Sequence, residues 1–177
     1  MNALITELKT RARIGLNAIH AGDFALVARA EAVSGKPRAH PPEWKLRHCL
    51  GLVANAVGFA DWDEGRRVLG GTAGAGDDMG TFWHAPRCNG LLSHWFARYD
   101  EARTSLAVAA DRTLLPYRRQ FVVVGEPYLR ELGLDPGDPH RHGAGRDLVA
   151  GYGGPDWLAL AERRLRAPLE TWAKPPI

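Results

Sequence analysis

The residues best suited to chemistry lie within residues 81–96, TFWHAPRCNGLLSHWF. His84 precedes Cys88 by four positions, and His94 follows it by six. A thiolate and imidazoles are the ligands of many zinc sites, and a cysteine activated by a histidine base is a common covalent nucleophile. The segment therefore predicts a candidate catalytic set of Cys88, His84 and His94.

The sequence around Cys88 gives a reason for its thiol to be reactive. Pro86 favours the first turn of a helix, which places Cys88 near a helix N-terminus. The backbone dipoles there, together with the adjacent Arg87, are expected to lower the pKa of the thiol. Arg87, or Arg119 from later in the chain, is the candidate side chain for holding an anionic ligand.

A structural role for Cys88 is the competing interpretation, and the sequence favours it. Free cysteine is among the most buried residue types, and this histidine and cysteine spacing matches no standard zinc signature. Three candidate ligands that are close in sequence also need not meet in space. We therefore assign no metal ligands and predict no particular cofactor.

The remaining cysteine and several histidines favour ordinary structural roles. Cys49 lies beside the apolar stripe of a predicted helix, whereas His48 and Asn55 are expected on its opposite, polar face. His140 and His142 lie in a polar loop and are expected to be solvated. Most of the six tryptophans lie on apolar helix faces, which indicates core packing.

Apolar spacing predicts helices through the first part of the chain. Leucine, alanine and isoleucine recur at helical spacing over residues 4–19, and residues 23–33 and 61–69 continue this pattern. The clearest helix spans residues 42–58, between an opening proline and a closing glycine. Three prolines make residues 34–42 a loop.

Residues 70–80, GGTAGAGDDMG, contain five glycines and predict a flexible joint. A phosphate-binding loop is the alternative for such a segment. It is disfavoured because these glycines follow a predicted helix and no Gly-Lys-Ser/Thr sequence follows them.

Short strands and further helices are predicted after the joint. Residues 81–83 are aromatic enough to form a strand, residues 91–109 predict a helix, and residues 113–124 form the only strongly β-like stretch. Short helices are expected over residues 126–132 and 155–165. The predicted fold is mainly α (α+β).

This organisation predicts two parts joined by the glycine-rich segment. A helical lobe over residues 1–70 is followed by the joint over residues 71–80. The lobe over residues 81–177 carries helices and a small two- or three-stranded β ribbon. Packing of both lobes as a single domain remains an open alternative.

Two sets of residues resemble uncharacterised bacterial proteins. The first resembles a small helical module, found in some proteins labelled glyoxalase-related, and consists of Leu8, Lys9, Ala12, Leu16, Leu46, His48, Leu50, Leu52, Val53, Ala54, Gly58, Phe59, Asp61 and Trp62. The segments LSHWFARYDEA, LLPYRRQFVVV and LGLDP are similar to an uncharacterised bacterial family of the same size. The resemblance implies no activity, because the strand-poor sequence lacks a counterpart of the metal-binding βαβββ units of glyoxalases.

Charge and composition limit the expected partners. Residues 1–50 carry eight Lys/Arg and four Asp/Glu, residues 51–111 five and eight, and residues 112–177 ten and eight. This modest clustering makes weak nucleic-acid binding an alternative and not the favoured interpretation. No apolar run approaches the length of a membrane span, and two cysteines without a secretory signal favour the cytoplasm.

The sequence contains no cofactor fingerprint, and three classes of function are expected. The favoured one is a binding or interaction protein that uses a cleft between the lobes or an aromatic-rich face, with a protein partner or a homodimer as further alternatives. The second is a cysteine-dependent enzyme or metal-binding protein built on the Cys88, His84 and His94 region. The third is the nucleic-acid-binding protein.

Overall fold

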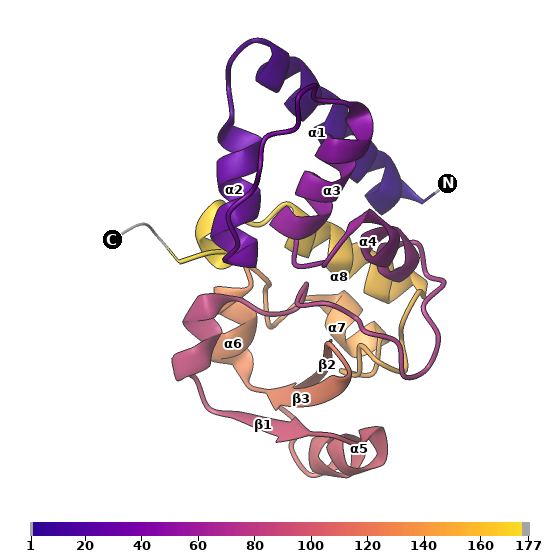
Figure 1. Cartoon of the computed structure of the whole chain (residues 1–177). Coiled ribbons are helices and arrows are strands. Elements are labelled where there is room, and N and C mark those ends of the chain that lie inside the picture. Colours follow the sequence, from indigo (N-terminus) through magenta and orange to yellow (C-terminus); the bar gives the residue numbers. More distant parts are fainter. Residues whose placement is uncertain (1, 175–177) are drawn as a thin grey trace.

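The computed structural model describes residues 2–174 and has the predicted mainly α fold with one small sheet (Figure 1). Its N-terminal part contains α1 (Ala3–His20), α2 (Ala25–Ser34), α3 (Leu46–Ala56) and α4 (Trp62–Leu69). Asn2 caps α1 by accepting a hydrogen bond from the Ile5 amide at 3.0 Å. Asp61 caps α4 in the same way, through the Glu64 amide at 2.8 Å.

The second part of the chain contains the sheet. Strands β1 (Ser93–Phe96), β2 (Thr113–Tyr117) and β3 (Gln120–Val124) pair antiparallel in the order β1-β3-β2. Helix α5 (Tyr99–Ala107) packs on one face of the sheet, as Figure 1 shows. The other elements are α6 (Glu126–Glu131), α7 (Pro139–Gly143), α8 (Pro155–Leu165) and the 3-10 helices η1 (Pro86–Gly90) and η2 (Leu169–Thr171).

Three local predictions in this part are wrong, and one of them is the polar loop around His140 and His142, which is the helix α7. The helix predicted over residues 91–109 begins only at Tyr99, because residues 93–96 form β1. In β1, Trp95 pairs with Val122 and Phe96 with Phe121, so cross-strand packing with β3 outweighs the local helical pattern. The strand predicted over residues 81–83 is a turn, in which the His84 amide donates to the Thr81 carbonyl at 3.0 Å.

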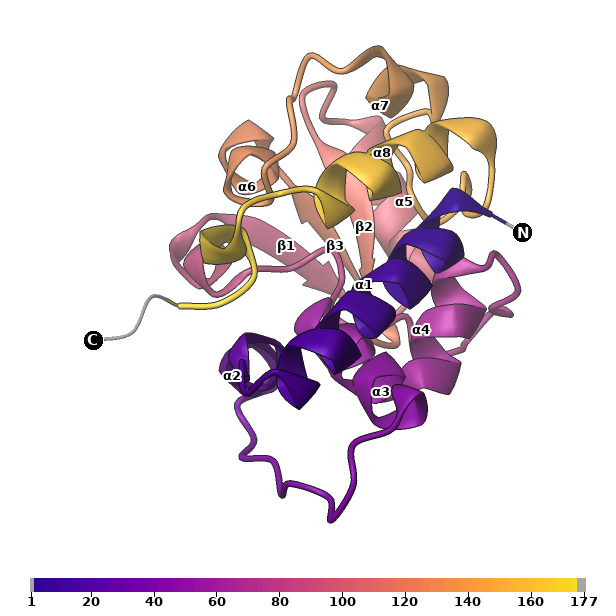
Figure 2. The same ribbon diagram turned by 90° about the horizontal axis from the view of Figure 1, so that it is seen from above.

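One hydrophobic core connects both predicted lobes. Leu8 of α1 and Val53 of α3 belong to the same buried cluster as Val122 of β3 and Trp157 of α8. Figure 2 shows α1 and α8 lying one above the other, across the boundary between the lobes. The buried aromatic residues of this cluster include Phe59, Phe82, Trp83, Trp157 and Trp172.

The glycine-rich segment is packed between these parts. The Ala73 amide donates to the Tyr152 hydroxyl at 3.1 Å, and the Met79 amide donates to the Arg118 carbonyl at 2.9 Å. Asp77 also lies 3.4 Å from Nε of Arg67 in α4, measured at its Oδ2, so the segment contacts both parts. Residue 1 and the last three residues of the predicted second lobe lie outside the described range. Among residues 2–174 no helix has the length and apolar character needed to cross a membrane.

Candidate functional site

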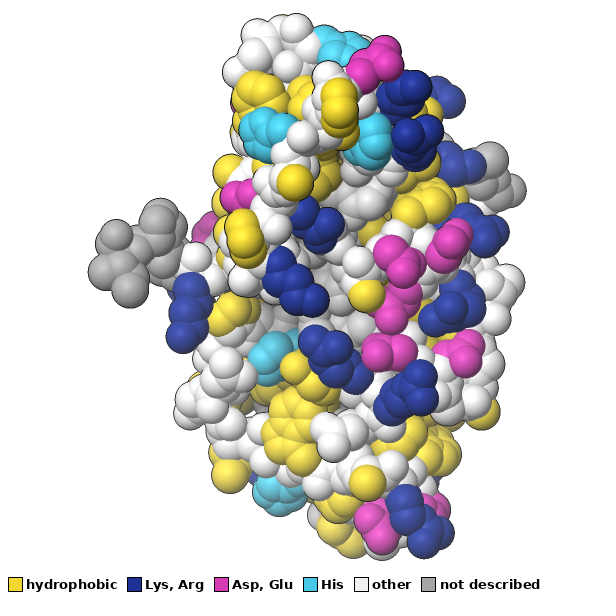
Figure 3. Space-filling view, in the orientation of Figure 1, with side chains coloured by type: hydrophobic (Ala, Val, Ile, Leu, Met, Phe, Trp, Pro, Cys, Tyr) yellow, Lys and Arg dark blue, Asp and Glu magenta, His cyan; other side chains and the backbone are white. Residues whose placement is uncertain are grey.

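A cleft of about 370 Å³ opens between the helical part and the sheet-containing part. Its helical side is lined by Lys36 and Arg38 from the loop after α2, together with Asn55 of α3. On the face seen in Figure 3, Lys and Arg side chains gather at mid-height, beside a group of Asp and Glu side chains and above a histidine. The volume is within the range of small-molecule sites.

Two glycines bring the walls of the cleft together. The Gly58 carbonyl accepts hydrogen bonds from the Thr81 amide at 2.8 Å and from the Thr81 hydroxyl at 3.1 Å. A Cβ atom on Gly58 would lie 2.7 Å from Oγ1 of Thr81, and one on Gly80 would lie 2.6 Å from the Phe59 ring. Both glycines also have positive φ, 92° and 65°. Glycine at both positions therefore allows the two segments to cross beside the cleft.

Asn55 fixes one cation at the helical wall. Its Nδ2 donates to the carbonyl oxygens of Phe59 at 2.9 Å and Ala60 at 2.8 Å, which leaves Oδ1 to accept from Nη2 of Arg38. Asn55 is only 3% exposed, so this orientation is enforced by its surroundings. Nε of Arg38 is buried and has no hydrogen-bond partner among residues 2–174. The Arg38 guanidinium is thus positioned with donor capacity to spare.

The cleft has an excess of positive charge. Lys36, Arg38 and Arg118 line it, whereas Glu64 is the acidic residue in the described lining. Oε2 of Glu64 accepts a hydrogen bond from the Ala60 amide at 2.6 Å, so one oxygen of this carboxylate already has a partner within the protein. Burial raises the pKa of Glu64, although the hydrogen bond from Ala60 opposes the shift. Even when Glu64 is fully ionised, the three cations of the lining outnumber its one carboxylate, so the cleft favours an anion.

His84 contributes a neutral imidazole from the opposite wall. Its Nε2 lies 3.0 Å from Oδ1 of Asn89 and its Nδ1 lies 2.7 Å from the Tyr128 hydroxyl. This network assigns Nε2–H as the donor to Asn89 and Nδ1 as the acceptor from Tyr128. Burial lowers the pKa of His84, and the nearby Arg164 acts in the same direction, while the bond to Asn89 opposes them. Both ring nitrogens are therefore occupied.

The predicted lowering of the Cys88 pKa is wrong. Cys88 is 1% exposed, and its thiol donates a long hydrogen bond of 3.9 Å to the Tyr128 carbonyl. Burial raises the pKa of this thiol to about 11, against weaker opposing effects of the Ala85 amide and Arg164. The residue lies within the five-residue helix η1, whose few aligned peptide dipoles do not offset that burial.

The structure does not bring the other predicted site residues to the cleft. Trp95 and His94 are consecutive in β1, so their side chains point to opposite faces of the sheet. The Trp95 ring lies 6.3 Å from the His84 ring, centroid to centroid. Because Trp95 is on the His84 side of the sheet, His94 points away from His84. Arg87 is exposed on η1, and Arg119 lies in the β2–β3 turn, outside the lining of the cleft. Residues 2–174 contain no group of three or more potential metal ligands.

Sequence reasoning missed Lys36, Arg38 and Asn55 as site residues. Asn55 was expected on the polar face of its helix, but it is buried and hydrogen-bonded. Its setting in LVANAV, with apolar residues on both sides, was the available signal, because a buried amide needs partners. The loop cations gave no comparable signal, since their position depends on contacts with α3.

Comparisons of the chain with protein-family models, with curated proteins and with solved structures found no match. The resemblance to uncharacterised bacterial proteins therefore stays an expectation from the sequence.

Proposed function

We propose that this is a binding protein that holds a small anion, a phosphate or carboxylate group, in the cleft between its two parts. The observation that carries the proposal is the pairing of buried Asn55 with Arg38. It fixes the guanidinium at the cleft through Nη2, and the structure gives this side chain no other hydrogen bond within residues 2–174. A guanidinium suits phosphate and carboxylate because it can donate two parallel hydrogen bonds.

Preorganisation supports binding at this position. A side chain that is already immobilised loses little conformational freedom when a ligand arrives, and this loss costs about 0.5–1.5 kcal/mol for a flexible side chain. The Arg38 backbone is also held, because its amide donates to the Glu31 carboxylate at 2.8 Å. The free protein therefore presents this cation in a nearly fixed position.

The rest of the lining suits a small organic anion. Lys36 and Arg118 add positive charge, and Thr81 and Asn89 add polar groups. The half-buried ring of Tyr117 offers apolar surface for the body of a ligand. Small-molecule sites commonly combine apolar surface with a few fixed polar groups.

The cysteine-dependent alternative receives less support from the same geometry. Of Cys88, His84 and His94, only His84 lines the cleft, and both of its ring nitrogens have partners. Cys88 is buried and its pKa is raised to about 11. Binding is therefore the better-supported proposal. We also propose a cytoplasmic location, supported by two cysteines that are both unpaired and buried.

Calorimetric titration with pyrophosphate and with citrate tests the proposal. At least one anion should bind, and the preferred one identifies phosphate or carboxylate as the ligand group. Arg38→Gln should weaken that binding at least tenfold, or about 1.4 kcal/mol. Arg13→Gln is the matched control, because Arg13 is exposed on α1 and does not line the cleft. The proposal fails if neither anion binds, or if both variants weaken binding equally.

A further inference from the structure

A second pocket, of about 310 Å³, lies on the other side of the β2–β3 turn from the cleft. The Met79 amide donates to the Arg118 carbonyl at 2.9 Å, and the Arg118 amide donates to the Gly80 carbonyl at 2.8 Å. Met79 lines the second pocket and Gly80 lines the cleft, so these bonds mark the boundary between the two. Arg118 lines both, whereas Arg119 lines only the second pocket.

The interior of the second pocket is apolar. Its hydrophobic lining includes Met79, Tyr99, Pro116, Phe121, Val149 and Tyr152. The tyrosine hydroxyls are already used, because Tyr99 donates to Asp147 at 2.6 Å and Tyr152 donates to the Val68 carbonyl at 2.6 Å. These two side chains therefore offer the pocket their rings and no free hydroxyl donor. Such a surface suits an aromatic or short acyl body.

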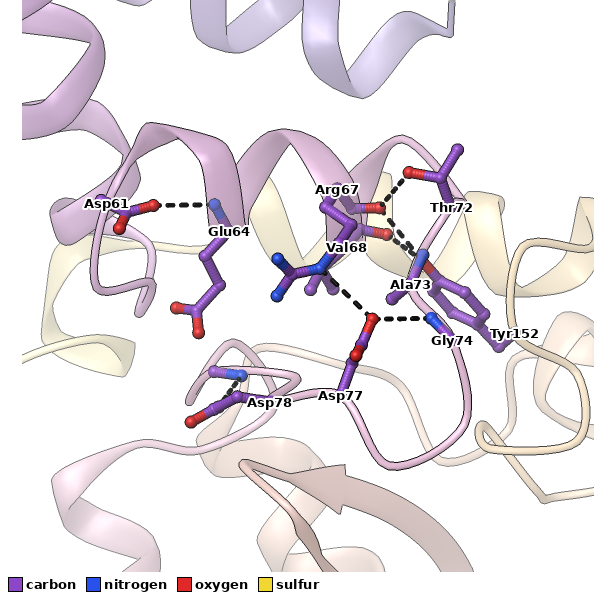
Figure 4. A network of polar contacts seen from close by, with 11 residues as sticks. Asp61, Glu64, Arg67, Val68, Thr72, Ala73, Gly74, Asp77, Asp78 and Tyr152 are labelled. Atoms are coloured by element: carbon purple, nitrogen blue, oxygen red, sulfur yellow. Dashed lines mark hydrogen bonds and ion pairs between the residues drawn. The ribbon is translucent and has the colours of Figure 1, made fainter.

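The glycine-rich segment forms a fixed wall of this pocket. Figure 4 shows Asp77 accepting from the Gly74 amide, at 2.8 Å, and facing Arg67, with 3.4 Å between Oδ2 and Nε. Tyr152 holds the start of the same wall through the Ala73 amide. Gly76 has a φ of 82°, and a Cβ added there would meet no atom within 4 Å. The wall is thus held by hydrogen bonds, and its glycines place no side chains in the pocket.

The charges of the lining favour a ligand whose polar end is negatively charged. Arg118 and Arg119 are exposed in the turn, and Asp77, the acidic residue in the described lining, is paired with Arg67. Positive charge therefore remains unbalanced beside an apolar interior. We propose that the second pocket binds an amphipathic monocarboxylate, with its apolar body against the rings and its carboxylate at Arg119. This inference goes beyond the proposed function and concerns a separate site.

Binding of 2-naphthoate, followed by amide NMR shifts, tests the inference. The largest shifts should fall on Gly74, Gly76 and Gln120. Arg119→Gln should weaken 2-naphthoate binding at least fivefold while leaving the weaker binding of neutral 2-naphthamide unchanged. Arg38→Gln is the matched control and should leave 2-naphthoate affinity within twofold, because Arg38 lines only the cleft.

The outcomes separate this inference from the anion-binding proposal. If 2-naphthoate binding is lost in Arg38→Gln and kept in Arg119→Gln, the compound occupies the cleft and the inference is wrong. Failure to bind at millimolar concentration would also overturn it. Binding that survives Arg38→Gln while pyrophosphate and citrate both fail to bind would support the second pocket and reject the cleft.

Discussion

Two arginines occupy contrasting regions of this protein, Arg164 in the core and Arg38 at the cleft. Arg164 is completely buried and donates to the carbonyls of Phe82, His84, Leu132 and Thr171, and to the Thr171 hydroxyl, at 2.9–3.1 Å. Its guanidinium also stacks on the Trp172 ring, with Cζ 3.5 Å from the centroid. Arg38 has one side-chain acceptor and a buried Nε without a partner in residues 2–174.

The difference teaches how to separate a structural cation from a binding one. Burial lowers the pKa of Arg164 to about 9, yet its donors are met by carbonyl oxygens that join η2, α8 and the segment before η1. Those bonds serve the fold. Arg38 is held on one side only, by Asn55, and keeps donor capacity for a ligand. Saturation of the donors, more than depth of burial, distinguishes the two roles.

Replacing Arg164 should have the largest effect. Arg164→Met leaves several buried carbonyls without donors, and breaking such a network costs about 3–5 kcal/mol of unfolding free energy. Urea unfolding measures this loss. Arg166→Met, at an exposed position on the end of the same helix, is the control and should change stability by less than about 0.5 kcal/mol. Equal losses in both variants would contradict the structural role.

Slow alkylation of Cys88 should show that its thiol is buried in the core, as Arg164 is. Because burial raises the pKa of Cys88 to about 11 and leaves its side chain only 1% exposed, its alkylation at pH 8 should be at least about a hundredfold slower than that of an exposed thiol with a pKa of 9.0. The rate should rise with pH towards the folded-state pKa. Peptide mapping of the native protein after iodoacetamide treatment measures this, and rapid modification below pH 8 would restore the reactive-cysteine hypothesis.

The same pKa difference links Cys88 to stability. The folded protein binds this proton more tightly than the unfolded chain, so the contribution is fully present below about pH 9. It should be lost as pH rises from 9 towards 11. Urea unfolding across this range should therefore show a decline that is reduced in Cys88→Ala.

Neutralising Lys36 should have the smallest effect and sharpen the comparison at the cleft. Lys36 is exposed, so solvent and salt screen its charge, and such interactions contribute about 0.2–1 kcal/mol. Lys36→Gln should weaken binding of the preferred anion two- to threefold, compared with at least tenfold for Arg38→Gln. Titration at low and high salt measures both. A larger loss from Lys36→Gln would show that fixation by Asn55 does not determine the site.

Local patterns predicted much of the fold. Spacing of apolar residues identified α1, α3 and α8, and the β-branched run of residues 120–124 identified β3. Strand β1 was missed because it depends on Val122 and Val124, far along the chain. Residue type predicted His84 as a site candidate, but the Arg38–Asn55 pair requires a loop to fold back on a helix, which no local pattern encodes.

The shared core has a consequence for how the protein unfolds. Leu8 and Val53 of the first part belong to one cluster with Val122 and Trp157 of the second, so separating the parts would expose apolar surface on each. Neither part then retains the burial that stabilises it. Loss of structure should be cooperative, with circular dichroism and tryptophan fluorescence following one transition at a single midpoint.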